Sequence, residues 1–180
     1  MTNLLLILLL LVGCDNDNIE TYRVAKSPSI TKNIQTSSTS ENSLKWDIPK
    51  GWIQSSGSKM RLASFNIPYS AGYGDLSIMV LSGDGGGVEA NINRWRGQIS
   101  LEPQTISDIN KISEKRKNKL GEYQIFEVIN NENKEKAFIC AIIPSTDTTI
   151  FVKLSIRASG ISEIKENFIY FCDSFKLNDE

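Results

Sequence analysis

The sequence predicts an α+β domain in which an antiparallel sheet of about six strands is flanked by helices on both faces. Residues 123–129, 137–143 and 149–156 have the alternating or wholly apolar pattern of strands, and short polar connections join them. Parallel neighbours would need a crossover of about a dozen residues, so these connections predict antiparallel pairing. Residues 138–143 are apolar at both parities, which indicates a strand that is covered on both faces.

The remaining elements follow from local patterns. Residues 46–52, around a Pro-Lys-Gly turn signal, predict a short first strand and a turn. Residues 60–67 and 76–81 alternate as strands do. Two other segments repeat apolar residues at helical spacing, and we expect the second helix to pack on the sheet. The first has Val88, Ile92, Trp95 and Ile99 in one stripe, and the second has Ile161, Ile164, Phe168, Phe171, Cys172 and Phe175 on a wide face.

Composition excludes several classes of function. The chain has 180 residues, with 20 basic and 21 acidic side chains and no histidine. Near-neutral charge provides no field that would attract nucleic acid, so we expect no nucleic-acid partner. Without histidine there is no Ser-His-Asp or Cys-His catalytic site and no His-ligated metal site. We therefore expect a protein that is not an enzyme and that holds no metal or cofactor.

The N-terminal segment indicates export. Residues 4–12 are all Leu, Ile or Val, too few to span a bilayer, which takes about 20, but typical of the apolar region of a signal peptide. Residues 11–14, Leu-Val-Gly-Cys, resemble the bacterial lipobox, which implies cleavage before Cys14 and attachment of diacylglycerol to its sulfur. Asp15 resembles an inner-membrane retention signal. Residues 1–3 carry no Lys or Arg, which departs from the usual signal-peptide pattern.

Three segments are expected: a signal peptide over residues 1–13, Cys14 with a flexible polar tether over residues 14–43, and one α+β domain over residues 44–180. The tether is rich in Ser, Thr and Asn and has too few apolar residues to bury a face. We expect acyl chains on Cys14 to hold the domain on the exported side of the cell membrane, and the inner membrane is favoured by Asp15. The expected partners are the lipid bilayer and an envelope protein.

Three short motifs carry a resemblance to known proteins. Residues 49–52 read Pro-Lys-Gly-Trp, residues 60–65 Met-Arg-Leu-Ala-Ser-Phe, and residues 91–98 Asn-Ile-Asn-Arg-Trp-Arg-Gly-Gln. Together with the order of elements, they resemble the PsbP-like α/β/α sandwich and a group of uncharacterised bacterial lipoproteins. The resemblance implies an accessory or binding role and no reaction.

A polar cluster around one aromatic residue of the first helix is the candidate recognition patch. Guanidinium groups can clamp a carboxylate through two hydrogen bonds, and Arg and Trp favour binding hot spots. The alternative is that Trp95 packs in the core while the arginines pair with acids or face solvent. Arg61 is included because a charge on a largely apolar strand face needs a partner. The patch comprises Arg61, Asn93, Arg94, Trp95, Arg96 and Gln98.

Gly85, Gly86 and Gly87 form a candidate anion loop, because they precede a helix whose first backbone amides lack partners. Gly85, Gly87 and Ala90 also match a dinucleotide fingerprint, but no parallel βαβ unit follows. A flexible connection between strand and helix is the alternative.

Two further features each have two interpretations. The basic residues of segment 111–119 could contact an anionic surface or protect a solvated edge strand. Cys140 and Cys172 could form a disulfide or remain free and buried, and we favour free thiols.

Three functions follow as hypotheses. The leading one is a binding or accessory module of the cell envelope that uses the first-helix patch. The second is a small anionic ligand carrier, with the glycine loop and Arg61 around one pocket. The third is a histidine-free hydrolase, for which the sequence marks no particular acid.

Overall fold

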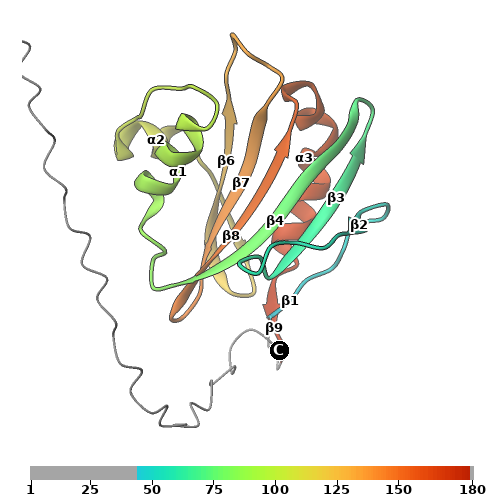
Figure 1. Ribbon diagram of the computed structural model, residues 1–180. Coiled ribbons are helices and arrows are strands. Elements are labelled where there is room, and N and C mark those ends of the chain that lie inside the picture. Colours follow the sequence, from blue (N-terminus) through green and yellow to red (C-terminus); the bar gives the residue numbers. More distant parts are fainter. Residues whose placement is uncertain (1–43, 179–180) are drawn as a thin grey trace, which may run out of the picture. The chain divides into compact units, whose positions relative to one another are not determined.

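The computed structural model describes residues 44–178, which form nine strands and three helices (Figure 1). Seven strands make one antiparallel sheet in the order β2-β3-β4-β8-β7-β6-β5, and β1 pairs with β9 in a separate ladder. The elements are β1 (Leu44–Lys45), β2 (Ile53–Gln54), β3 (Ala63–Tyr69), β4 (Gly72–Ser82), α1 (Val88–Gly97), α2 (Ile106–Ile112), β5 (Glu114–Asn118), β6 (Gly121–Ile129), β7 (Ala137–Pro144), β8 (Thr148–Ile156), α3 (Ala158–Asp173) and β9 (Lys176–Leu177).

The predicted α+β class and antiparallel pairing are confirmed, with seven strands in the main sheet where about six were expected. Helix α2 and strand β9 were not predicted, and the strand expected over residues 46–52 is replaced by two short strands, β1 and β2, on either side of the turn. Strand β5 is the solvated edge strand that was one of the two interpretations of segment 111–119. The residues of β5 are Glu-Lys-Arg-Lys-Asn, so no apolar side chain marks them as a strand. The segment forms a strand because it pairs with the free edge of β6, and this pairing depends on the tertiary structure.

Strand β7, which lies inside the sheet, is buried on both sides, as its sequence predicts. Its odd-numbered residues, such as Ile139, enter an apolar cluster with Phe168 and other α3 residues. Its even-numbered residues, such as Phe138, enter a second cluster with Trp95 of α1 and Ile109 of α2. Successive side chains of a strand point to opposite faces, so β7 lies between two apolar layers.

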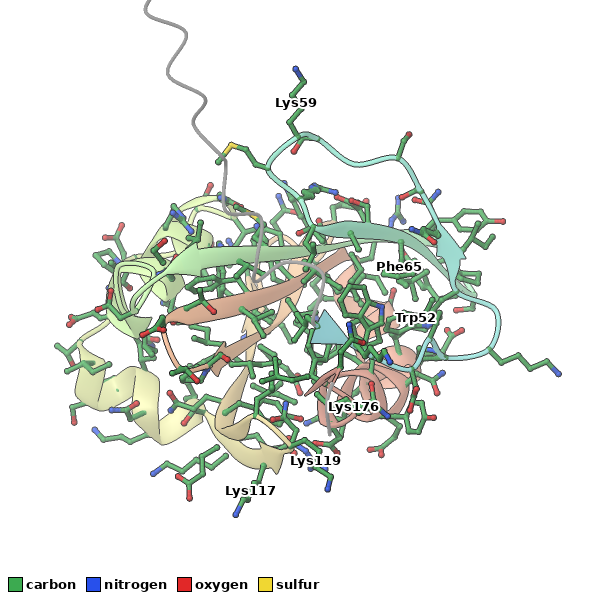
Figure 2. All side chains as sticks on the ribbon, turned by 90° about the horizontal axis from the view of Figure 1, so that it is seen from below. Trp52, Lys59, Phe65, Lys117, Lys119 and Lys176 are labelled. Carbon is green, nitrogen blue, oxygen red and sulfur yellow. The ribbon has the colours of Figure 1, made fainter. Side chains whose placement is uncertain are left out.

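Helix α3 approaches the sheet closely at one glycine. A Cβ atom added to Gly160 would lie 2.6 Å from a ring carbon of Tyr69 and 2.8 Å from Cδ1 of Ile156. Farther along α3, the ring of Phe171 lies 4.9 Å from that of Trp52, between centroids. Figure 2 shows Trp52 and Phe65 side by side above the helix. Aromatic side chains therefore cover this end of the α3 layer.

Three basic residues of segment 111–119 belong to the edge strand β5, which an ion pair connects to α3. Arg116 donates to Asp173 at 2.7 Å, and the hydroxyl of Tyr123 donates to the same carboxylate at 2.6 Å. Burial raises the pKa of Asp173, but the hydrogen bonds from Arg116 and Tyr123 outweigh it and leave the net pKa below its usual value. Lys117 and Lys119 point away from the domain (Figure 2), as expected for a charged edge that resists further strand pairing.

Both cysteines of the described domain are free and buried, as favoured from the sequence. Cys140 belongs to the cluster with α1, and Cys172 belongs to the cluster with α3. The sheet lies between the two clusters, so the two sulfur atoms are on opposite sides of it. Burial raises the pKa of both thiols, which are therefore unreactive.

The predicted signal peptide over residues 1–13, the lipidation site Cys14, Asp15 and the tether over residues 14–43 lie outside the described residues. Within residues 44–178, no helix has the length and apolar content needed to cross a membrane.

We expect Phe168→Ala to lower the free energy of unfolding by about 3–5 kcal/mol, because it removes a fully buried ring from the α3 layer. Tyr170, two residues along the same helix, is 54% exposed, so Tyr170→Ala should change stability by less than about 0.5 kcal/mol. Urea denaturation of both variants measures the difference. Equal losses would show that α3 does not cover the sheet as described.

Candidate functional site

The candidate site is a cavity of about 390 Å³ beside the C-terminal half of α1. Its floor is the part of the sheet that α1 and α2 leave uncovered. Along β8, Phe151 is buried beneath α1, whereas Lys153 and Ser155 farther along the same face are only half-buried. The cavity is lined by Arg61, Asp75, Ser77, Met79, Arg94, Trp95, Gln98, Lys136, Phe138, Lys153 and Ser155.

Strand register places the floor residues in two rows. Lys153 of β8 lies opposite Ser77 of β4. One step along the strands, Ser155 lies between Asp75 and Phe138. Residues two apart on a strand share a face, so both rows point toward α1.

Lys153 is the cation at the centre of the site. Its ammonium lies 3.8 Å from the ring centroid of Phe138 and 5.8 Å from that of Trp95, within the range of cation–π attraction. It also donates a hydrogen bond to Oε1 of Gln98, the residue that ends α1. The two rings and one amide hold the charge in place.

The surroundings of Lys153 disfavour its charged form. Burial lowers its pKa to about 8. This value already includes the charges of Lys136, Arg94 and Arg61, which also lower the pKa, and the opposing effect of Cys140. An anion in the cavity would favour the protonated ammonium.

Arg61 and Asp75 form an ion pair at the rim. Both terminal nitrogens of Arg61 donate to the Asp75 carboxylate, each at 2.9 Å. The arginine also donates to the hydroxyl of Ser64 at 3.4 Å. This is the partner that a charge at the start of β3 requires.

The other cations around the cavity have no such partner. Within residues 44–178, no carboxylate pairs with Arg94, Lys136 or Lys153. Arg94 donates to the side-chain oxygen of Asn91, and the ammonium of Lys136 lies 5.5 Å from the Phe138 ring. With Asp75 neutralised by Arg61, the cavity carries an excess of positive charge and can attract an anion.

The structure brings together four of the six residues predicted for the recognition patch. Arg61, Arg94, Trp95 and Gln98 line the cavity. Trp95 is also buried in the α1 cluster, so its ring belongs to the core and also borders the cavity.

Asn93 and Arg96 serve a different purpose, because they fix the segment that follows α1. Asn93 donates to the backbone oxygen of Gln104 and accepts from its amide, both at 2.8 Å. Arg96 donates to the backbone oxygen of Glu102 at 2.7 Å. Neither lines the cavity.

The glycine loop lies at the opposite end of α1, and Gly85, Gly86 and Gly87 do not line the cavity with Arg61. The amide of Gly86 already donates to the Asp84 carboxylate at 2.9 Å. A Cβ atom on Gly85 would lie 2.4 Å from the Phe151 ring, and its φ is +61°. Close packing and backbone conformation therefore account for glycine at this position.

Sequence reasoning missed Asp75, Lys136 and Lys153. Lys153 carried a usable signal, because it interrupts a strand that pairs on both sides and whose other face is fully apolar. Asp75 and Lys136 carried none, because strand register is what places Asp75 beside Ser155 and Lys136 near the end of β8.

Comparison with known proteins yields structural similarities only. No protein-family model matches the chain, and no curated protein matches it. A crystal structure from Bacteroides thetaiotaomicron VPI-5482 has 10% sequence identity and a TM-score of 0.46, covering 76% of this chain and 46% of that one. The chain thus spans less than half the length of that protein.

Two further structures are similar. The solution structure of cyanobacterial PsbP (CyanoP) from Synechocystis sp. PCC 6803 has 15% identity and a TM-score of 0.47, covering 75% of this chain and 92% of that one. The crystal structure of LpqN, involved in cell envelope biogenesis of Mycobacterium tuberculosis, has 11% identity and a TM-score of 0.42, with coverages of 74% and 82%. At these values the similarities assign neither a family nor a function.

The lowered pKa of Lys153 predicts a pH dependence of stability. The folded state releases this proton near pH 8, whereas the unfolded chain retains it until about pH 10.4. The free energy of unfolding should therefore gain a favourable increment as the pH rises between these values. Chemical denaturation of wild type and Lys153→Met at pH 7 and pH 10 isolates this increment, which the variant should lack. An identical pH dependence in both proteins would contradict the assignment.

Proposed function

We propose that this protein is an exported lipoprotein whose domain binds an envelope partner or ligand through an anionic group seated in the Lys153 cavity. One observation carries the proposal: Arg94, Lys136 and Lys153 converge on one cavity without a carboxylate partner among residues 44–178. Cations held together without counter-charge lower stability, and an anionic ligand would relieve the repulsion.

The chemistry of the lining suits a carboxylate or phosphate group. Arg94 can offer two parallel N–H donors, and Lys153 adds a point charge that the Phe138 ring holds in position. Hydroxyl groups of Ser77 and Ser155 on the floor add neutral hydrogen-bonding groups. Binding rather than turnover is favoured, because Asp75, the carboxylate that lines the cavity, is engaged by Arg61.

A small anionic ligand carrier is the second candidate, because a volume of about 390 Å³ can hold a free metabolite-sized ligand. The two candidates differ in whether small anions bind by themselves with useful affinity or only as part of a larger partner.

The anchor and the sandwich architecture belong to the same proposal. Acyl chains on Cys14 contribute about 0.8 kcal/mol per buried methylene. A coil over residues 14–43 would extend about 30 Å from the membrane.

We also propose that the fold is the PsbP-like α/β/α sandwich, with α1 and α2 on one face and α3 on the other. Two separate apolar clusters support this, and the sequence motifs resemble those of accessory and binding proteins.

The cavity is tested with variants of two of its cations, and a second arginine of α1 provides the control. We expect Arg94→Gln and Lys153→Gln to weaken binding of inorganic phosphate by about tenfold each, as loss of a hydrogen bond to a charged group typically costs. Arg96→Gln is the matched control, because it removes an equal charge outside the cavity. Isothermal titration calorimetry at low salt measures the affinities. Equal weakening by the control would mean that only general charge attraction is at work.

Asp75→Asn should have the opposite effect. The substitution removes the anion that now occupies Arg61 and frees the guanidinium for the ligand. Phosphate affinity should therefore rise by several-fold in the same titration. A decrease would show that Asp75 positions Arg61 for binding and does not compete with the ligand.

The anchor is tested separately. Cys14→Ser removes the sulfur to which the lipid would attach, so the full-length variant should move from the membrane fraction to the soluble fraction when expressed in bacteria. Mass spectrometry of the wild-type N-terminal peptide should find it acylated at Cys14. Unchanged partitioning of the variant would exclude a lipoprotein anchor at this residue.

A further inference from the structure

A second cavity of about 270 Å³ adjoins the first. The two share Lys136 and Ser155 in their linings, so they lie next to each other at these residues. The second cavity extends past the end of β8 to Arg157, with Tyr69 and Tyr73 along its side.

Lys153, Ser155 and Arg157 form a line along one face. Their numbers share parity, and the backbone of Arg157 remains extended, with φ −70° and ψ 149°. Four residues of a strand cover about 13 Å, which separates the Cα atoms of Lys153 and Arg157. The antiparallel pairing of Ala137 with Ile156 places Lys136 beside Arg157, at the end of this line.

Arg157 is a second point at which an anion can bind. Its guanidinium pairs with Glu135 at 2.9 Å, with side chains 52% and 70% exposed. Such an exposed pair contributes at most about 1 kcal/mol, so a ligand anion can replace Glu135. Lys136 lies between the two ends and pairs with no carboxylate among residues 44–178.

The backbone at the floor of the two cavities cannot pair with a peptide strand. Strand β8 pairs with β4 on one side and with β7 on the other. Its backbone N–H and C=O groups are therefore occupied, so a peptide cannot add as a further strand there. Recognition must come from side chains. The two linings contain five cationic side chains and two carboxylates, Asp75 and Glu135, each of which is already paired with an arginine.

We propose that the two cavities form one groove that binds an extended, non-peptide polyanion. One anionic group lies at Arg94 and Lys153, and another lies at Lys136 and Arg157. The repeating groups are phosphates or carboxylates on a flexible chain. This inference rests on the proposed anion-binding function and specifies the class of ligand.

The test compares probes of different length by calorimetry at one salt concentration. Inorganic phosphate should bind weakly, and pentaphosphate or trigalacturonate should bind at least about tenfold more tightly, since engagement of a second charged site supplies 1.4 kcal/mol or more. The phosphate and uronate chains distinguish the two types of anionic group. Pentaglutamate should bind less tightly than the preferred chain.

Two variants test whether the tighter binding of the longer probes depends on Arg157. Arg157→Gln should remove most of the advantage of the chain while phosphate binding at Lys153 persists, whereas Lys153→Gln should weaken the binding of both probes. Helix α3 should persist, because Arg157 makes no side-chain cap to it, and circular dichroism checks this. Lys136→Gln should weaken the binding of both phosphate and chain, because Lys136 lines both cavities, and Lys117→Gln on the edge strand is the control for loss of one charge.

The outcomes separate the two proposals. If phosphate binds and depends on Lys153, but chain and phosphate bind equally or Arg157→Gln has no selective effect, the extended groove is overturned and the anion site stands. If no probe binds, the proposed function fails and the groove fails with it. If pentaglutamate binds most tightly, the non-peptide class is wrong.

Discussion

The rest of the structure depends on the burial of β7 between two apolar layers. Phe138 and Ile139 are neighbours in sequence, yet one packs toward α1 and the other toward α3. A strand that is apolar at both parities cannot leave either face in water without a large cost. Residues of α1 and α2 supply apolar partners in one cluster and residues of α3 supply them in the other, and the surrounding strands become polar where these clusters end.

The length of α1 determines where its cover ends. Ten residues make a helix of about 15 Å, which reaches only part of a sheet whose longest strand has eleven residues. Under the helix, β4 and β8 present Met79 and Phe151. Beyond Trp95 the same strands present polar and charged side chains, and the cavity forms at this boundary.

Electrostatics distinguishes this cavity from an ordinary polar surface. A surface optimised for stability would pair its cations with acids, as Arg116 is paired with Asp173 on the opposite face. Lys153 instead rests on the Phe138 ring, and burial lowers its pKa to about 8. Local departures from stabilising chemistry are characteristic of binding sites, where the ligand supplies the missing charge.

The sequence by itself determined the antiparallel α+β class and the double burial of β7, because these depend on periodicity and short connections, whereas it only favoured free cysteines over a disulfide. It also selected Arg61, Arg94, Trp95 and Gln98, but it grouped with them Asn93 and Arg96, which brace a loop. Only the tertiary structure decided that Lys153, Lys136 and Asp75 complete the cavity and that the glycine loop lies away from it. Those neighbours come from strands distant in sequence, and their register depends on the packing of the whole sheet.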